Sequence, residues 1–399
     1  MSNYLIKLTP VGKFFFGGDM TFSVGTKDLP KEWYKRPSEE RKRIEDQVRF
    51  NTRYASYIIK SEKFPQQTSL LGMLRFLLLQ NSDLFDGVKI KDGTSEQVKA
   101  LIGKKSFMAG EKGEFGCIKK LSPCFLMKED QIITRLPLDY GLKEVSLNRH
   151  DNHHQYYNSK VVDLSTIKIE DDGKTKDFTA KDGDVSEKYG YGCVVMEEKD
   201  IFIEDLRIGI NRNIETGHTE DNALFKQVNY RLADDFCFAL YAQIDEKLPY
   251  SSGNCFASYT KKMVSLGADN SQFVIEIIPL ENKDSEELPV VSLPRTKVKL
   301  DAGRKKVVLT SPAFVDDSTV ERSYYHIATT IPFKHMETNT GLSSYHRLSG
   351  IQHSKKVELF QTGSVFYFKS EKDASDFAGI LKNRADYYQI GYNHCQVTD

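Results

Sequence analysis

Alternating hydrophobic and polar positions predict strands in the first part of the chain, arranged around one long helix. Strands are predicted at 4–9, 201–210, 223–232, 236–244 and 272–279. The almost continuously apolar run from Thr68 to Gln80 predicts a helix, and 253–266 is compatible with a second helix that ends at Gly267. The resulting order of strand, helix, strand, strand, helix, strand is that of a ferredoxin-like domain.

A similar order of elements follows the acidic and polar segment 281–289, which we interpret as a linker. Strands are predicted at 306–315, 357–360, 365–368 and 387–397, and helices at 318–330 and 371–384. The sequence therefore predicts an α+β fold with two tandem ferredoxin-like domains. These are residues 1–280, with an insertion at about 84–200, and residues 290–399. A single larger α+β domain is the alternative.

Composition is typical of a globular protein: 28% of the 399 residues are charged and 11% are aromatic. There is no apolar run of about eighteen residues, so no membrane span is expected. The first residues lack the apolar core of a signal peptide, and the six cysteines form no CxxC pair. These features favour a cytoplasmic protein with reduced thiols. The acidic segment 171–188 is expected to be mobile or to order only on a partner.

The formal net charge of zero argues against a free-standing nucleic-acid binder, but the charge is unevenly distributed. Residues 170–205 contain twelve acidic and five basic residues, whereas residues 289–369 contain twelve basic and six acidic residues. The basic part suits RNA, and the acidic part suits a basic partner. Ordinary solvated surfaces explain such runs equally well.

The helix start segment Phe64-Pro65-Gln66-Gln67-Thr68-Ser69-Leu70-Leu71-Gly72-Met73-Leu74-Arg75 is the most informative part of the sequence. Thr68 or Ser69 is expected to cap the helix. A helix N-terminus with exposed amides, a glycine at Gly72 and a guanidinium at Arg75 can hold phosphate. A buried helix, in which Gly72 permits tight packing, is the alternative.

Two further segments combine glycine with aromatic or basic residues. In Thr362-Gly363-Ser364-Val365-Phe366-Tyr367-Phe368, the Gly363-Ser364 step is expected to free amides for phosphate, and an aromatic ring is expected to stack on a base. Arg207-Ile208-Gly209-Ile210-Asn211-Arg212-Asn213 leads into a polar hairpin that can contact RNA backbone. The alternatives are a glycine bulge with aromatic residues in the core and a solvated hairpin.

Neither a metal nor a cofactor is predicted. His150, His153 and His154 are closely spaced, but no cysteine or helical HExxH pattern accompanies them. The GxSxG, Walker and GxGxxG motifs are absent as well.

Taken together, these segments resemble the RAMP proteins of CRISPR systems, and most closely the third subunit of Cmr, the type III-B effector. The resemblance rests on four ordered segments: the helix start segment, Arg135-Leu136-Pro137-Leu138-Asp139, the Arg207–Asn213 segment with the following Ala223-Leu224-Phe225, and Thr362–Phe368 with the later Ile390-Gly391-Tyr392. It extends over nearly the whole chain.

The resemblance implies two ferredoxin-like domains that hold the repeat-derived 5′ tag of the CRISPR RNA. It also implies docking against the large polymerase-like subunit and the backbone subunits of Cmr. The RNA-binding residues that it implies are Thr68, Ser69, Gly72, Arg75, Arg207, Arg212, Gly363 and Ser364.

The leading hypothesis is therefore a non-catalytic RNA-binding subunit of an antiviral ribonucleoprotein. The first alternative is a RAMP endoribonuclease that processes precursor CRISPR RNA. Such enzymes usually use a histidine, which the family carries near the first helix, whereas the first histidine of this chain is His150. Metal-independent cleavage that is lost on substitution of His153 or His154 would favour the enzyme. The second alternative is a protein-interaction module whose RNA contacts lie on other subunits.

Overall fold

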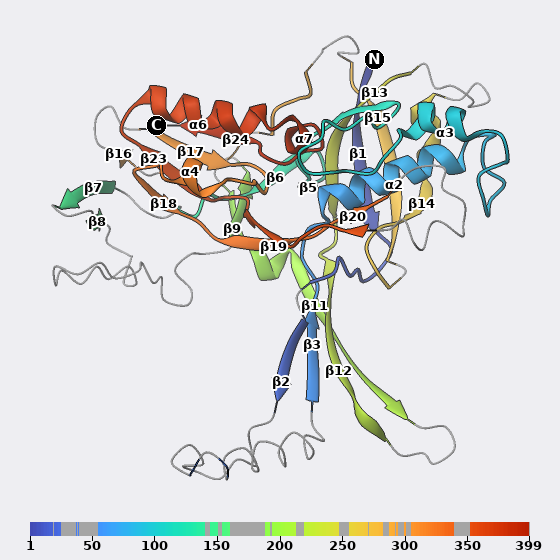
Figure 1. Cartoon of the computed structure of the whole chain (residues 1–399), viewed down its shortest axis with the longest axis horizontal. Coiled ribbons are helices and arrows are strands. Elements are labelled where there is room, and N and C mark those ends of the chain that lie inside the picture. Colours follow the sequence, from blue (N-terminus) through green and yellow to red (C-terminus); the bar gives the residue numbers. More distant parts are fainter. Residues whose placement is uncertain are drawn as a thin grey trace.

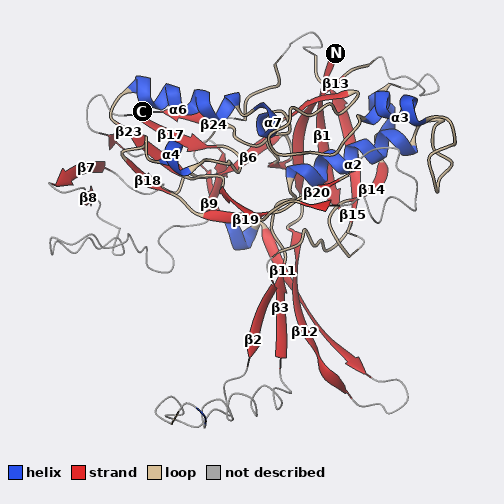
Figure 2. Ribbon diagram, viewed as in Figure 1, coloured by secondary structure: helices blue, strands red, loops and turns tan. Residues whose placement is uncertain are grey.

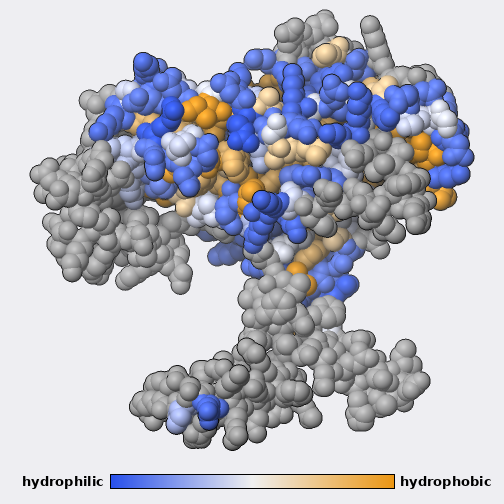
Figure 3. Space-filling model, in the orientation of Figure 1, coloured by the Kyte–Doolittle hydropathy of each residue, from blue (hydrophilic) through white to orange (hydrophobic). Residues whose placement is uncertain are grey.

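The chain is a mixed α/β protein in which strands predominate over a few helices (Figures 1 and 2). The computed structural model describes residues 1–18, 20–24, 37, 39, 55–139, 144–150, 154–159, 188–191, 194–212, 219–246, 255–269, 271–281, 287–291, 293, 299–300, 305–338 and 352–398. On the face shown in Figure 3, hydrophilic residues dominate the described surface, and hydrophobic residues form smaller patches. Among these residues, no helix combines the length and the apolar content needed to cross a bilayer.

The main sheet has the strand order β10-β9-β6-β5-β13-β1-β15-β14, and β4 also pairs with β13. Its strands are β1 (Ser2–Pro10), β4 (Ile118–Leu121), β5 (Phe125–Lys128), β6 (Gln131–Arg135), β9 (Lys188–Tyr191), β10 (Val194–Glu197), β13 (Phe236–Ile244), β14 (Lys262–Ser265) and β15 (Gln272–Pro279). Strand β1 lies between β13 and β15 and runs antiparallel to both. Every residue of β13 is buried, so this strand forms the middle of the core.

Helix α2 (Gln67–Gln80) lies beside the main sheet together with the shorter α3 (Ser95–Ile102) (Figure 1). Its buried apolar side chains are Leu70, Leu71, Met73, Leu74, Leu77, Leu78 and Leu79. Their spacing at three and four residues gives the helix a wide apolar face, as the sequence pattern predicts. The predicted helix from Thr68 to Gln80 is thus confirmed.

Four strands form an arm that projects from the main sheet (Figure 1). They are β2 (Met20–Val24), β3 (Ala55–Lys60), β11 (Phe202–Arg212) and β12 (Thr219–Leu232), in the order β11-β12-β3-β2. Strands β11 and β12 pair antiparallel, which confirms the predicted hairpin, and β12 continues into β13 after a short turn. Strand β11 lies at the edge of this sheet.

The C-terminal part has a second sheet in the order β18-β23-β17-β24, with antiparallel pairs. Its strands are β17 (Lys305–Leu309), β18 (Tyr325–Ile327), β23 (Val365–Phe368) and β24 (Cys395–Thr398). Helix α6 (Glu371–Asn383) covers this sheet through Phe377, which packs on Phe366 and Phe368. The Ser370 side chain accepts a hydrogen bond from the Asp373 amide and so caps α6.

Smaller elements complete the described structure. They are α4 (Asp317–Val320), α7 (Ala385–Tyr388), η2 (Glu198–Asp200), η3 (Phe256–Tyr259), and the ladders β7 (Glu144–His150)–β8 (His154–Ser159), β16 (Lys299–Leu300)–β7, β19 (Thr330–Phe333)–β22 (Val357–Phe360) and β20 (Met336–Glu337)–β21 (Gln352–His353).

Several predicted elements are wrong. The helix predicted at 253–266 is replaced by η3 and β14, because Lys261 adopts a positive φ of 61° and the chain then pairs with β15. The helix predicted at 318–330 ends at Val320 in α4, and β18 follows it. The strand predicted at 387–397 begins only at Cys395, since Gly391 and Asn393 both have positive φ and form a turn.

Some C-terminal residues belong to the main hydrophobic core, whereas the C-terminal sheet and α6 form a separate hydrophobic cluster. Phe333, Leu359, Ile390 and Tyr392 belong to the same buried cluster as the residues of α2 and β13. A fully buried ion pair also joins Asp139 to Lys306, whose Nζ lies 2.6 Å from Asp139 Oδ2. The Tyr367 hydroxyl donates to the same carboxylate oxygen at 2.9 Å. The division into domains 1–280 and 290–399 stays a prediction.

Candidate functional site

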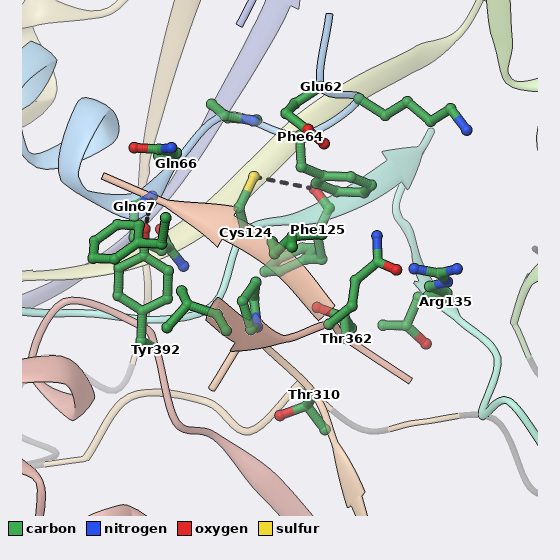
Figure 4. A pocket seen from close by; sticks show the side chains of 18 of the residues that line it. Glu62, Phe64, Gln66, Gln67, Cys124, Phe125, Arg135, Thr310, Thr362 and Tyr392 are labelled. Carbon is green, nitrogen blue, oxygen red and sulfur yellow. Dashed lines mark hydrogen bonds between the residues drawn. The ribbon is translucent and has the colours of Figure 1, made fainter. Parts of the chain in front are cut away.

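A cavity of about 390 Å³ lies between the main sheet and the C-terminal part of the chain (Figure 4). Three of the four sequence segments that carry the family resemblance contribute to its wall. Gln66 comes from the helix start segment, Arg135 from the Arg135–Asp139 segment and Thr362 from the glycine–aromatic segment. In Figure 4, Tyr392 and Arg135 lie at opposite ends of this wall.

The helix start segment is held in place before α2 begins. The Ser61 hydroxyl donates to the Glu62 carbonyl and accepts from the Phe16 amide, and the Glu62 amide donates to the Gly17 carbonyl. Pro65 is buried and has no N–H group that would need a partner. This anchoring fixes the backbone of residues 61–66 along one side of the cavity.

The start of α2 is hydrogen-bonded to the C-terminal part of the chain. The Gln67 amide donates to the Tyr392 hydroxyl oxygen at 3.1 Å, and Gln67 Nε2 donates to the carbonyls of Ser122 and Gly391. No side-chain cap comes from Gln66, the residue at the N-cap position. The expectation that Thr68 or Ser69 caps the helix is therefore wrong, and so is the expectation that the first amide is exposed.

Gly363 is packed against protein backbone. Its φ is +90°, and an added Cβ would lie 2.8 Å from the Leu136 carbonyl oxygen. Its amide donates to the Leu309 carbonyl at 2.8 Å, and its carbonyl accepts from the Leu138 amide at 2.9 Å. The expectation of a free amide at Gly363 is wrong, because the turn joins β17 to the Arg135–Asp139 segment instead.

The residues that follow Gly363 are buried. Ser364 has no accessible surface, and its amide donates to the Gln361 carbonyl. Phe366, Tyr367 and Phe368 are each at most 1% exposed. The expectation that one of these rings stacks on a base is wrong, since both faces of β23 are covered.

Arg75 points to the end of α3. Its Nε donates to the Ile102 carbonyl at 2.6 Å and its NH2 group approaches the Gly103 carbonyl at 3.5 Å. A cation at a helix C-terminus is favoured by the carbonyls that lack partners there. Burial lowers the pKa of Arg75 to about 10.

Gly72 and Ser69 lie on the exposed face of α2, and Thr68 is half-buried. A Cβ added at Gly72 would meet no atom within 4 Å, so tight packing does not explain this glycine. Phe76 lies one turn further on the same face and is 53% exposed. This face of the helix is therefore accessible from outside.

Arg207 and Arg212 lie on β11 in the arm. Arg207 is exposed and stands opposite Gln227 of β12, and the Arg212 backbone pairs with Thr219. His218 and Asn213 of the predicted hairpin lie outside the described residues. Arg207 does not line the cavity, so the structure does not bring all predicted site residues together.

Two lysine–glutamate pairs line or border the cavity where the arm begins. Lys63 is paired with Glu198, and Lys60 Nζ lies 3.0 Å from Glu204 Oε1. The hydrogen bond to Lys60 lowers the pKa of Glu204, and the same bond raises the pKa of Lys60. Sequence analysis missed these residues, although Lys60 and Lys63 directly precede the helix start segment.

An aromatic surface lies next to these pairs. The Phe64 ring is half-buried and stacks on Tyr189, with ring centres 6.3 Å apart and an interplanar angle of 15°. It also meets Phe238 edge-on at 5.7 Å. Because Tyr189 and Phe238 are buried, they hold the Phe64 ring in one orientation.

A family model of a CRISPR-associated protein (Cas_Cmr3) matches residues 44–398. The chain belongs to this family. It is accordingly a subunit of a type III CRISPR effector of the Cmr kind. No curated protein matches the chain.

Solved type III complexes contain chains that are similar to this chain. One is a chain of the type III-B Cmr-beta complex bound to cognate target RNA, with 13% identity, a TM-score of 0.44, and coverage of 99% of this chain and 96% of that one. Another belongs to the Csm3-Csm4 subcomplex of the type III-A CRISPR-Cas interference complex. It has 11% identity, a TM-score of 0.33, and coverage of 92% and 97%.

The described histidine side chains include His326, His335 and His394. Burial lowers the pKa values of His326 and His335, and it lowers the pKa of His394 to about 4. His150 and His154 lie on β7 and β8, and His153 lies outside the described residues. Within the described ranges, no group of three or more potential metal ligands is found.

Proposed function

We propose that this chain is the non-catalytic Cmr subunit that binds the 5′ repeat-derived tag of the CRISPR RNA. The observation that carries the proposal is the convergence of Gln66, Arg135 and Thr362 on one cavity from three distant segments. Arg135 and Phe64 line the same wall. A basic and an aromatic side chain in one place suit single-stranded RNA, which proteins bind through charge and through stacking on bases. The exposed Arg207 on the arm adds a position for backbone phosphate.

The chain is further proposed to dock the large polymerase-like subunit onto the backbone subunits. Support comes from the edge strand β11, on which Ile203, Leu206 and Ile208 are 43%, 51% and 63% exposed. Exposed edge strands with apolar side chains are favourable places for protein contacts.

Each part of the chain is proposed to be a ferredoxin-like domain. The order β15-β1-β13-β5 in the main sheet supports this, and so does the order β24-β17-β23-β18 in the C-terminal sheet. In each set, the first and third strands of the motif pair at the centre of the sheet. The second strand of the first motif is β5, which lies inside the predicted insertion 84–200.

Ultraviolet crosslinking of the assembled complex, followed by mass spectrometry of this chain, tests the proposal. Adducts are expected on peptides that contain residues 61–67, and none on peptides from α6, which does not line the cavity. Absence of any adduct on this chain would favour the protein-interaction module. Metal-independent cleavage of labelled repeat RNA by the purified chain would favour the endoribonuclease.

Substitution of one exposed arginine provides a second test. Arg207→Ala is expected to weaken RNA binding by the full chain about tenfold, because a charge-assisted contact to phosphate is lost. The matched control is Lys372→Ala, which removes an exposed charge on α6. The probe is a synthetic copy of the 5′ segment of the RNA that copurifies with the complex. Equal effects of both variants would count against a specific role of the arm.

A further inference from the structure

We propose that the cavity holds one unstacked nucleobase of the RNA, while the phosphates stay outside. Phe64 and the Lys63–Glu198 pair are the groups that recognise this base. The inference rests on the proposed function, and it specifies which part of the RNA enters the cavity.

Two of the backbone amides that the sequence predicts as phosphate ligands already donate hydrogen bonds within the protein. The Gln67 amide is bonded to Tyr392, and the Gly363 amide is bonded to Leu309. Binding of phosphate at a helix N-terminus or a backbone nest requires free N–H groups that point at the anion. Neither of these two amides can serve as such a ligand unless a bond within the protein is broken.

The charges on the cavity wall also disfavour a phosphate. Lys60, Lys63 and Arg135 line the wall together with Glu62 and Glu198, and each of the two lysines is paired with a glutamate carboxylate. A phosphate would therefore have to compete with a carboxylate for either lysine, and it would also lie near Glu62. A neutral base leaves both ion pairs intact.

The Phe64 ring offers a fixed surface for stacking. It lines the cavity, and its stacked contact with Tyr189 and edge-on contact with Phe238 fix its plane. A base that stacks on an immobile ring loses less entropy on binding than one that must order the ring first. Stacking on an aromatic side chain tolerates every base, because each base has a π face.

The Lys63–Glu198 pair supplies a donor beside an acceptor. The side chains are 24% and 15% exposed, so both remain reachable from the cavity although they are largely desolvated. An ammonium can only donate hydrogen bonds and an ionised carboxylate can only accept them. Together they complement a base edge on which a ring nitrogen or carbonyl lies beside an amino or imino group.

Abasic substitution along the RNA tests the inference. The probe is the synthetic copy of the 5′ segment described above, made as a series with a single abasic nucleotide at each position. One position is expected at which loss of the base weakens binding to the full wild-type chain at least tenfold. Binding to Phe64→Ala should show no further loss at that position, because the base and the ring act as a coupled pair.

Two controls separate stacking from other effects. Phe76→Ala removes an exposed ring outside the cavity wall and should keep the full abasic penalty. Phe64→Leu preserves apolar packing but cannot stack, so it should behave like Phe64→Ala. The salt dependence of binding should be the same for wild type and both Phe64 variants, since no phosphate contact is lost.

The outcomes distinguish the inference from the proposed function. If RNA binds but no abasic position is coupled to Phe64, the base site is wrong and RNA binding by the chain stands. If Glu198→Gln strengthens binding and steepens its salt dependence, a phosphate enters the cavity and the inference is overturned. If the wild-type chain and its complex bind no RNA, the proposed function fails.

Discussion

Tyr392 acts at the start of α2 in the way that a serine, threonine or aspartate side chain usually does. Its hydroxyl oxygen accepts the Gln67 amide, and its ring is buried edge-on to Phe333. Burial raises the pKa of Tyr392, so the phenol stays neutral throughout the ordinary pH range. The residue thus completes the helix and fixes the Gln67 side of the cavity.

Removal of this hydroxyl should destabilise the protein. Tyr392→Phe leaves the buried Gln67 amide without its acceptor, and the expected loss is about 1–3 kcal/mol in the free energy of unfolding. Urea unfolding of the full chain measures it. Ser69→Ala, which removes an exposed hydroxyl from the same turn, should change stability by no more than about 0.5 kcal/mol. A larger loss for Ser69→Ala than for Tyr392→Phe would contradict this assignment of the cap.

His394 makes stability depend on pH. Its ring stacks on Tyr388 at 4.0 Å, and burial lowers its pKa from 6.5 to about 4. Between pH 6.5 and about pH 4, His394 is protonated in the unfolded chain but not in the folded chain. Stability should therefore fall as the pH falls from about 6.5 to about 4, by about 3 kcal/mol from this residue. The difference between wild type and His394→Gln, measured by urea unfolding at pH 7 and pH 5, isolates this contribution. Parallel pH profiles would refute it.

Among the elements, those with a strong pattern and a clear end could be predicted from the sequence. Helices α2 and α6 and strand β15 lie where periodicity places them. The segment 253–266 could not be predicted correctly, because Phe256 and Tyr259 have helical spacing but the backbone reverses at Lys261. Which strand pairs with which depends on tertiary packing, so the pairing of β5 with β13 gave no local signal.

Two glycines with opposite surroundings provide a paired test. Gly363→Ala should destabilise the protein by about 2 kcal/mol or more, because φ is +90° and the new Cβ would overlap the Leu136 carbonyl. Gly72→Ala should stabilise it by up to about 1 kcal/mol, because α2 gains a better helix former in open space. Chemical unfolding of both variants measures the difference. Weaker RNA binding by Gly72→Ala would show instead that RNA approaches this face of the helix.

At the scale of the whole molecule, a buried charge network links segments that are distant in the sequence. Asp139 bonds both Lys306 and Tyr367, and the three side chains have no accessible surface. The sequence showed the Arg135–Asp139 segment only as part of a resemblance, because nothing local indicates a partner so far along the chain. The sequence pattern also could not predict that three such segments meet at one cavity.

Breaking the ion pair should be costly. Asp139→Asn and Lys306→Met should each lower the free energy of unfolding by about 3–5 kcal/mol, because each leaves a buried group without its partner. The double variant Asp139→Asn/Lys306→Met should lose much less than the sum of the two single losses. Urea unfolding of the wild type and the variants completes the cycle, and strictly additive losses would argue against a coupled pair.

The bond between Gln67 and Tyr392 spans 325 positions of the sequence. A chain that grows from its N-terminus on the ribosome cannot form this bond until Tyr392 has emerged. The start of α2 therefore gains this acceptor only after the central strands can already pair. A chain truncated before Tyr392 should leave the cavity wall at Gln67 without this hydrogen bond.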